Sequence, residues 1–221
     1  MKFRVRPTAL TILSLIAGSV TPASAWKADT TQLVIVEVTA PTSTSGTLSV
    51  VEVTDGKESI VMRPVPARVG RSGVSASHRE GDGTTPLGRF AITGAFGLAE
   101  APRVLLPYRR VREGDCWISG SGGPSYNFRV RRSNCGSPNE DLWRIAKAGP
   151  YEYALTTSYN TSPVVAGKGS AIFIHVNSSN DRGETRPTSG CVSVAISVMK
   201  RLFALLDPAK NPTLIVRIRR S

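Results

Sequence analysis

The alternation of apolar and polar residues along the chain predicts a mainly β structure. Residues 32–39 are rich in β-branched side chains, and residues 47–53 alternate between apolar and polar positions. The small and polar residues 42–46 between them are typical of a turn, so the two segments predict a hairpin. Further strands are predicted at residues 58–63, 66–69, 90–94, 151–158, 171–176 and 213–218.

Helical periodicity is confined to two short segments. Residues 195–206 place Ile196, Met199, Phe203 and Leu206 on one apolar face, and Asp207-Pro208 ends the predicted helix. A second short helix is predicted at residues 139–146. Because many short strands accompany one or two short helices, and neither a repeat nor a linker divides the chain, we expect a single mainly β domain, a sandwich or a barrel.

The first 25 residues are typical of a secretory signal peptide. Three basic residues open the chain, residues 8–20 are apolar, and Ala23-Ser24-Ala25 is a small-residue cleavage signal. The apolar run is shorter than the roughly 20 residues that a membrane-spanning helix needs. We therefore expect a signal peptide at residues 1–25, a mobile leader at 26–31, and a catalytic domain at 32–221. The mature protein would be exported to the periplasm, the cell envelope or the medium, without a transmembrane segment.

The chain is basic, with a formal net charge of +12, of which three cations lie in the expected signal peptide. An exported protein with the remaining +9 is attracted to anionic polymers of the cell envelope by long-range electrostatics. A solvated, unpartnered surface is the alternative. Nucleic acid is not an expected partner, because the cations are scattered and export separates the protein from it.

Three cysteines in an exported chain indicate one disulfide and one free thiol. Cys116 and Cys135 lie 19 positions apart in a stretch rich in glycine and serine, whereas Cys191 follows Gly190 at the start of an apolar segment. The simplest pairing joins Cys116 to Cys135. A disulfide that closes a loop of this size contributes about 3 kcal/mol to stability.

The free thiol also has a candidate base. The chain has two histidines, and His175 stands 16 positions before Cys191. An imidazole beside a thiol activates it as a nucleophile. Strand alternation places His175 with Phe173, on the face opposite Ile174. Each residue also has a structural interpretation, as a buried inert cysteine and a hydrogen-bonded core histidine. His78 lies in a polar loop and is expected to be exposed and non-catalytic. The cysteines and histidines do not form close metal-ligand pairs, so we expect no metal.

Three segments together resemble the catalytic domain of the L,D-transpeptidases, the YkuD-like family of bacterial cell walls. They are residues 81–90 (GDGTTPLGRF), residues 167–175 (GKGSAIFIH) and residues 187–192 (PTSGCV). The resemblance extends from about residue 32 to the end of the chain. It implies the L,D-transpeptidase fold, with Cys191 as the nucleophile and His175 as the catalytic histidine.

The chain departs from the family's usual signature, Ser/Thr-His-Gly-Cys followed by an apolar residue and then Arg or Asn. Thr188 matches the first position, but Ser189 replaces the histidine and Ser193 replaces the basic or amide residue. The chain is therefore most similar to a divergent branch with the pattern Thr-x-Gly-Cys. The changes leave the nucleophile and its base in place but alter the surroundings of the substrate.

The resemblance implies cell-wall cross-linking or remodelling, in which Cys191 attacks the carbonyl between an L-centre and a D-centre of a peptidoglycan stem peptide. His175 protonates the departing D-amino acid, and an amine resolves the thioester. The backbone amides of Gly190 and Cys191 are expected to stabilise the oxyanion, and Thr188 and Ser189 to orient His175 or bind substrate. This chemistry needs neither a metal nor an organic cofactor. Two alternatives remain: an L,D-carboxypeptidase or amidase that uses water, and a non-catalytic module that binds the envelope.

Overall fold

The computed structural model describes residues 30–100, 103–120 and 123–219. The expected signal peptide and most of the expected leader lie outside these residues. Strand β1 (Thr30–Val38) begins two residues before the predicted strand. No helix in the described part of the chain is long and apolar enough to cross a membrane.

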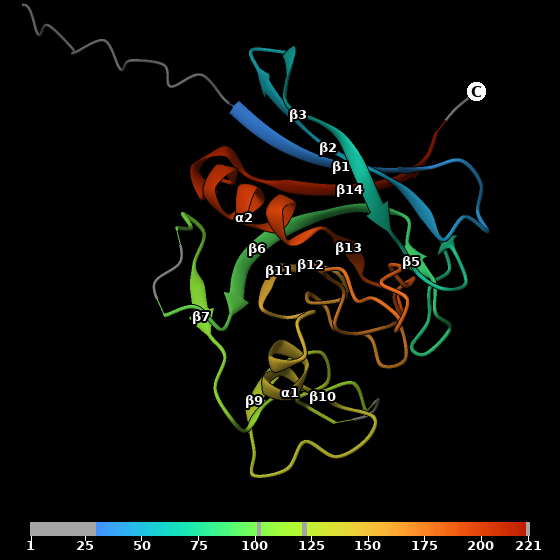
Figure 1. Ribbon diagram of the computed structural model, residues 1–221, viewed down its shortest axis with the longest axis vertical. Helices are drawn as coiled ribbons and strands as arrows, with labels where there is room; N and C mark the ends of the chain where they lie inside the picture. The colour runs from blue at the N-terminus through green and yellow to red at the C-terminus, as the bar shows by residue number, and fades with distance from the viewer. Residues whose placement is uncertain (1–29, 101–102, 121–122, 220–221) are drawn as a thin grey trace, which may run out of the picture.

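A large curved sheet forms the body of the domain (Figure 1). Its strands in spatial order are β11 (Tyr153–Thr157), β12 (Phe173–Val176), β13 (Val192–Val194), β3 (Lys57–Arg68), β2 (Ser45–Thr54), β1, β14 (Thr213–Ile218), β6 (Gly88–Gly97) and β7 (Tyr108–Arg110). Because β6 pairs with β11 as well as with β14, the sheet closes into a barrel-like ring. Within this ring, β13 and β3 are joined by a single residue pair, Ser193 opposite Arg68. The predicted mainly β fold is confirmed.

Local patterns predicted the longer strands, with one correction, but not the strands of two or three residues. The hairpin of β1 and β2 is present, and β14 lies parallel to β1. The two short strands expected at residues 58–63 and 66–69 are one strand, β3. The ladder shifts register between the pairs Val50–Met62 and Leu48–Val65. Proline is tolerated in a strand at such an irregularity, so Pro64 does not end β3.

The main hydrophobic core fills the interior of this sheet and is sealed by α2 (Ile196–Leu205). Met199, Leu202 and Phe203 of α2 are at most 1 % exposed and belong to that core. The predicted helix is confirmed, but its apolar face is rotated from the prediction. Ile196 is 37 % exposed, and Leu202 is buried in addition to the predicted residues.

A small sheet below the barrel in Figure 1 consists of β8 (Asp115–Trp117), β9 (Arg129–Arg131) and β10 (Glu140–Asp141), in the order β10-β8-β9. The predicted Cys116–Cys135 disulfide fastens it, and Cys191 is free, as predicted. Helix α1 (Leu142–Lys147) follows directly. It starts later than predicted because residues 140–141 pair with β8 and the Asp141 carboxylate caps the helix. A third sheet consists of two short parallel strands, β4 (Val74–Ser75) and β5 (Thr85–Pro86).

Candidate active site

Cys191 stands at the end of a tight turn, immediately before β13. The Thr188 hydroxyl accepts a hydrogen bond from the Gly190 N–H at 3.1 Å and donates one to the Cys191 carbonyl at 2.6 Å. Gly190 has a φ of 150°, and a Cβ there would lie 3.0 Å from the Thr84 carbonyl oxygen. The turn therefore requires glycine, which explains why this residue precedes the cysteine.

The segment at residues 81–90 supports this turn from the other side. Thr85 is completely buried, and its hydroxyl donates to the Cys191 carbonyl at 3.2 Å while accepting from the Gly70 N–H at 2.8 Å. The Cys191 carbonyl is thus held by two threonine hydroxyls from distant parts of the sequence. The first motif of the chain consequently acts as a brace for the cysteine turn.

His175 is presented by β12, which lies parallel to β13 with His175 opposite Ser193. As the alternation predicted, Ile174 and Val176 belong to the main core, whereas Phe173 packs in a second cluster that includes Cys191. The Nδ1 atom of His175 lies 2.7 Å from the carbonyl oxygen of Val176. Because a carbonyl only accepts, Nδ1 carries the proton and Nε2 of the neutral ring is the basic nitrogen.

The Cys191 thiol is hydrogen-bonded to main-chain atoms. It donates to the Ala171 carbonyl at 3.1 Å and accepts from the Phe173 N–H at 3.4 Å. Ala171 has a φ of 53°, a left-handed conformation that is uncommon for a residue with a side chain. The buried Asn127 side chain accepts from the Ala171 N–H at 3.0 Å. Backbone strain of this kind concentrates at functional sites, and here it aims a carbonyl at the thiol.

Burial keeps both groups uncharged. It raises the pKa of Cys191 to about 12, and the negative charge of Glu140 acts in the same direction. Burial lowers the pKa of His175 to about 4. At neutral pH Cys191 is therefore a thiol and His175 a neutral imidazole.

Two further residues at the thiol were not predicted from the sequence. The hydroxyl of Tyr151 lies beside Cys191 and donates to Glu140 Oε2 at 2.7 Å. The Tyr151 ring also meets His175 edge-on, with ring centroids 5.3 Å apart. Desolvation raises the pKa of Glu140 to about 7. Neither residue belongs to a motif, so no pattern in the sequence distinguishes these positions.

A pocket with a volume of about 300 Å³ opens onto this group of residues. Gly190, Ser189 and Cys191 form one wall, and Glu140, Glu80 and Arg71 contribute charged side chains. Ser170, also in the lining, is 7 % exposed, and its hydroxyl has no hydrogen-bond partner among the described residues. A pocket that combines a thiol with charged side chains and one unsatisfied hydroxyl is suited to a polar ligand.

The expectation that His78 would be exposed was wrong, and its expected lack of a catalytic role stays a prediction. His78 is 7 % exposed and lines the same pocket as Cys191. Its Nδ1 atom lies 3.0 Å from Asp82 Oδ1 and 3.0 Å from Thr84 Oγ1, so the polar loop folds over the ring. Burial lowers the pKa of His78, although Asp82 and Glu80 oppose this change. The burial of His78 could not be predicted from the polar loop, because polar residues of the loop bind the ring instead of solvent.

Comparison with known proteins assigns the family. The model of the YkuD L,D-transpeptidase catalytic domain matches residues 35–217. The chain belongs to this family. The match contains the cysteine turn, β12 and the segment at residues 81–90 that braces the turn. No curated protein matches the chain.

Three solved structures are similar to this L,D-transpeptidase domain at low identity. The helical cell shape determining protein Pgp2 from Campylobacter jejuni is 17 % identical, with a TM-score of 0.46, over 87 % of this chain and 49 % of that one. An L,D-transpeptidase from Stackebrandtia nassauensis is 16 % identical, with a TM-score of 0.37, over 86 % and 57 %. The avibactam carbamoyl enzyme of Ldtfm is 17 % identical, with a TM-score of 0.33, over 87 % and 50 %. The chain thus spans about half the length of these proteins.

Proposed function

We propose that this protein is an exported, cysteine-dependent L,D-transpeptidase that acts on peptidoglycan stem peptides through a thioester on Cys191. The observation that carries the proposal is the single free thiol at the wall of a polar pocket, within a domain of the L,D-transpeptidase family. Export is supported by the signal-like first 25 residues and by the disulfide, which is typical of oxidising compartments.

Cys191 is the proposed nucleophile and His175 its general base. The Val176 carbonyl supports this role, because it fixes the imidazole tautomer whose Nε2 accepts a proton. The sulfur attacks the carbonyl carbon between the L-centre and the D-centre while the thiol proton passes to Nε2. The carbonyl electrons move to oxygen and return as the C–N bond breaks. The departing D-amino acid takes the proton from the imidazolium, which leaves a thioester.

A second amine then attacks the thioester carbon and gives its proton to His175, and the sulfur leaves and is protonated again. For the oxyanion we assign the Cys191 N–H, because the Gly190 N–H is already directed to Thr188. Thr188 therefore acts by shaping the turn. Ser189 is exposed at the pocket wall and is the residue of this turn assigned to substrate contact.

We assign Tyr151 and Glu140 a positioning role at the thiol. The Tyr151 hydroxyl lies beside Cys191 and is anchored by Glu140, while the ring limits the space available to His175. The negative charge of Glu140 opposes formation of a thiolate before substrate enters. This arrangement keeps the nucleophile protonated at rest, so that its activation depends on a bound substrate.

Hydrolysis on the same scaffold is the second candidate function. Ser189 replaces a histidine ring of the usual signature, and a wetter site favours water as the acceptor. The buried His78 ring lines the same pocket and occupies space that water would otherwise fill. The third candidate, a non-catalytic envelope-binding module, is disfavoured because both Cys191 and His175 are present.

The test is to incubate the purified protein with a tetrapeptide muropeptide and to weigh the products. Cross-linked 3-3 dimer supports the transpeptidase, and tripeptide monomer alone supports the hydrolase. Some tripeptide is expected beside the dimer. A carbapenem β-lactam should add covalently to the wild type but not to Cys191→Ala. Turnover by the alanine variant would disprove the nucleophile assignment, and the absence of both products would favour the binding module.

A further inference from the structure

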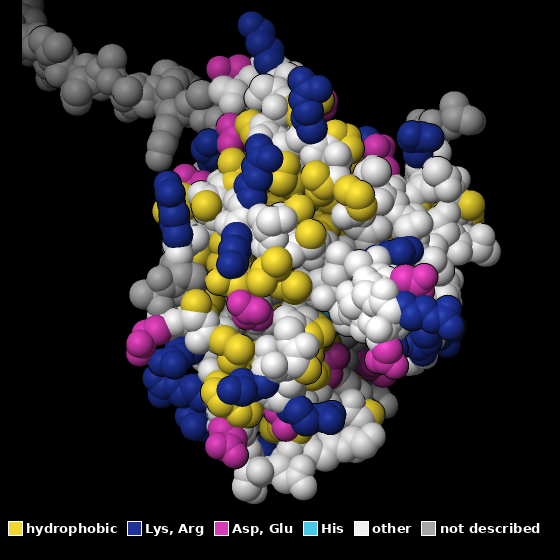
Figure 2. Space-filling model, viewed as in Figure 1, with side chains coloured by type: hydrophobic (Ala, Val, Ile, Leu, Met, Phe, Trp, Pro, Cys, Tyr) yellow, Lys and Arg dark blue, Asp and Glu magenta, His cyan; other side chains and the backbone are white. Residues whose placement is uncertain are grey.

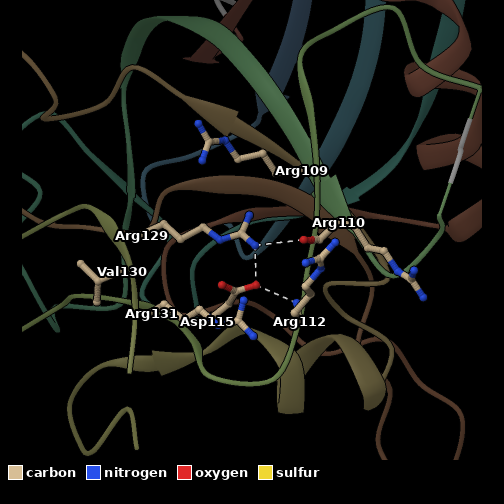
Figure 3. Close-up of a pocket in the computed structure, with 7 residues that line it drawn as sticks. All are labelled: Arg109, Arg110, Arg112, Asp115, Arg129, Val130 and Arg131. Carbon is tan, nitrogen blue, oxygen red and sulfur yellow. Dashed lines mark hydrogen bonds and ion pairs between the residues drawn. The ribbon is translucent and has the colours of Figure 1, made fainter. Parts of the chain in front are cut away.

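An open groove with a volume of about 390 Å³ lies on the small sheet, away from the cysteine pocket. It is lined by residues of β7, β8, β9 and the loop after β7 (Figure 3). Five of the lining side chains are guanidinium groups and one is a carboxylate: Arg109, Arg110, Arg112, Arg129, Arg131 and Asp115. On the face that Figure 2 shows, Lys and Arg side chains gather beside β7.

The floor of the groove is ordered by one buried ion pair. The side chain of Asp115 is 9 % exposed and that of Arg129 is 19 % exposed, and the two are paired. Arg129 also donates to the carbonyl oxygen of Arg110 at 3.0 Å, and Asp115 accepts from the backbone N–H of Arg112 at 2.6 Å. Figure 3 shows that Arg129 reaches across from β9 and joins the two sides of the groove. These contacts fix the positions of Arg129 and Asp115 in the groove.

The remaining cations exceed the available anions. Arg110 pairs with the exposed Glu100. Arg131 donates to the backbone carbonyl of Glu113 at 3.3 Å but has no acidic partner among the described residues. Among the described residues, the side chains of Arg109 and Arg112 have no hydrogen-bond partner and no ion-pair partner. Like charges held close together repel one another, so a bound anion would lower the energy of this cluster.

We propose that this groove binds the phosphate groups of an anionic polymer. Guanidinium groups match phosphate in geometry, because their parallel N–H donors bind two oxygens at once. Three unpaired guanidinium groups offer more donors and more charge than a single carboxylate satisfies. The groove is open and exposed, which suits a chain that passes over it better than an enclosed small molecule. For the exported protein proposed above, the ligand would be a phosphodiester polymer of the cell envelope.

The experiment measures binding of an inorganic polyphosphate of defined length by titration at low and at physiological salt. The groove variant replaces Arg109, Arg112 and Arg131 by glutamine. The matched control makes the same change at Arg63, Arg89 and Arg219, three exposed arginines outside the groove. We expect the groove variant to bind at least tenfold more weakly than the control, because both lose the same net charge. All six side chains are exposed, so unfolding midpoints should stay close to the wild-type value.

Equal weakening of the groove variant and the control would show attraction by net charge alone and would overturn the site. Tighter, groove-dependent binding to phosphatidylglycerol vesicles than to polyphosphate would assign the groove to a membrane surface instead. Tighter binding to a single-stranded DNA of equal charge would assign it to nucleic acid. Cys191→Ala should bind polyphosphate like the wild type, so failure of the proposed catalytic function would leave this result unchanged.

Discussion

The cysteine pocket borders the β10 edge of the small sheet, and the arginine groove borders its β9 edge. The pocket disfavours the charged form of its thiol, whereas the groove gathers charged side chains. At the β10 edge, Glu140 belongs to a pocket whose thiol, that of Cys191, is kept neutral by burial. At the β9 edge, Arg129 and Arg131 belong to an open groove whose cations are permanently charged. The difference is one of solvent exposure, because removal of water penalises charged forms and exposure to it stabilises them.

This contrast separates the two proposed tasks of the protein. In the proposed reaction the neutral thiol would react when substrate rearranges its surroundings, whereas the exposed arginines would attract an anionic polymer from a distance. The Cys116–Cys135 disulfide fastens the sheet that carries both edges. Changes to one edge should therefore leave the other intact, and changes to the disulfide should affect both.

The largest effect is expected from His175→Gln. Loss of a general base lowers rates by about 10²- to 10⁴-fold, and we expect a decrease of this size in acylation of Cys191 by a carbapenem, followed by mass spectrometry. His78→Gln is the matched control, because it removes the imidazole that lines the cysteine pocket. Binding of polyphosphate should be unchanged in both variants. A decrease of less than tenfold in His175→Gln would exclude this residue as the base.

Removal of the disulfide should affect both the cysteine pocket and the arginine groove. With both Cys116 and Cys135 replaced by serine, we expect the free energy of unfolding to fall by about 3 kcal/mol, as for a loop of this length. Urea denaturation measures this directly. Cys191→Ser serves as the control for loss of a buried cysteine. Acylation and polyphosphate binding should both weaken, and retention of full polyphosphate binding would show that the groove does not depend on the disulfide.

A smaller change is expected in the reactivity of the thiol when Glu140 loses its charge. Because the carboxylate raises the pKa of Cys191, Glu140→Gln should lower that pKa and accelerate alkylation by iodoacetamide at pH 8. One unit of pKa corresponds to about a tenfold change in the thiolate population. At pH 5 the two proteins should react equally, because the wild-type Glu140, with a pKa of about 7, is then protonated.

Glu80→Gln is the control for this experiment, since Glu80 lines the pocket but lies outside the contacts of the thiol. If Glu140 also positions Tyr151, carbapenem acylation should fall in Glu140→Gln although alkylation rises. Parallel increases in both rates would reduce the role of Glu140 to its charge.

The smallest effect concerns stability between pH 5 and 6.5. His175 has a pKa lowered to about 4, so the folded state resists its protonation, and stability falls as pH decreases below about 6.5. Glu140 has a pKa raised to about 7, so stability falls as pH increases from about 4.5 to 7. The two trends oppose each other, and the wild type should vary by only about 1 kcal/mol across this window in urea denaturation.

Variants that lack one of the two groups should show the pH dependence of stability that the other group causes. His175→Gln should become less stable as pH rises from 5 to 6.5, and Glu140→Gln should become more stable over the same range. A flat profile in both variants would show that neither group titrates differently in the folded and unfolded states.

Local patterns predicted the features that depend on neighbouring residues. β-Branched runs predicted β1 and β14, alternation predicted β2, helical spacing predicted α2, and the number and placement of the cysteines predicted the disulfide. The strand that carries His175 was also recognisable, because its alternation spans only a few residues. The merged strand β3 and the exposed Ile196 were not, because pairing with β2 and packing against the core decided them.

The sequence by itself determined a mainly β domain of the L,D-transpeptidase family with one free thiol and one disulfide. Only the tertiary structure decided what surrounds that thiol. Glu140, Tyr151 and His78 come from three separate segments, and the arginines of the groove come from two strands and a loop. Such groups meet only when sheets close and bury them. Burial, which no local pattern specifies, then sets their charge by removing water from some and leaving it around others.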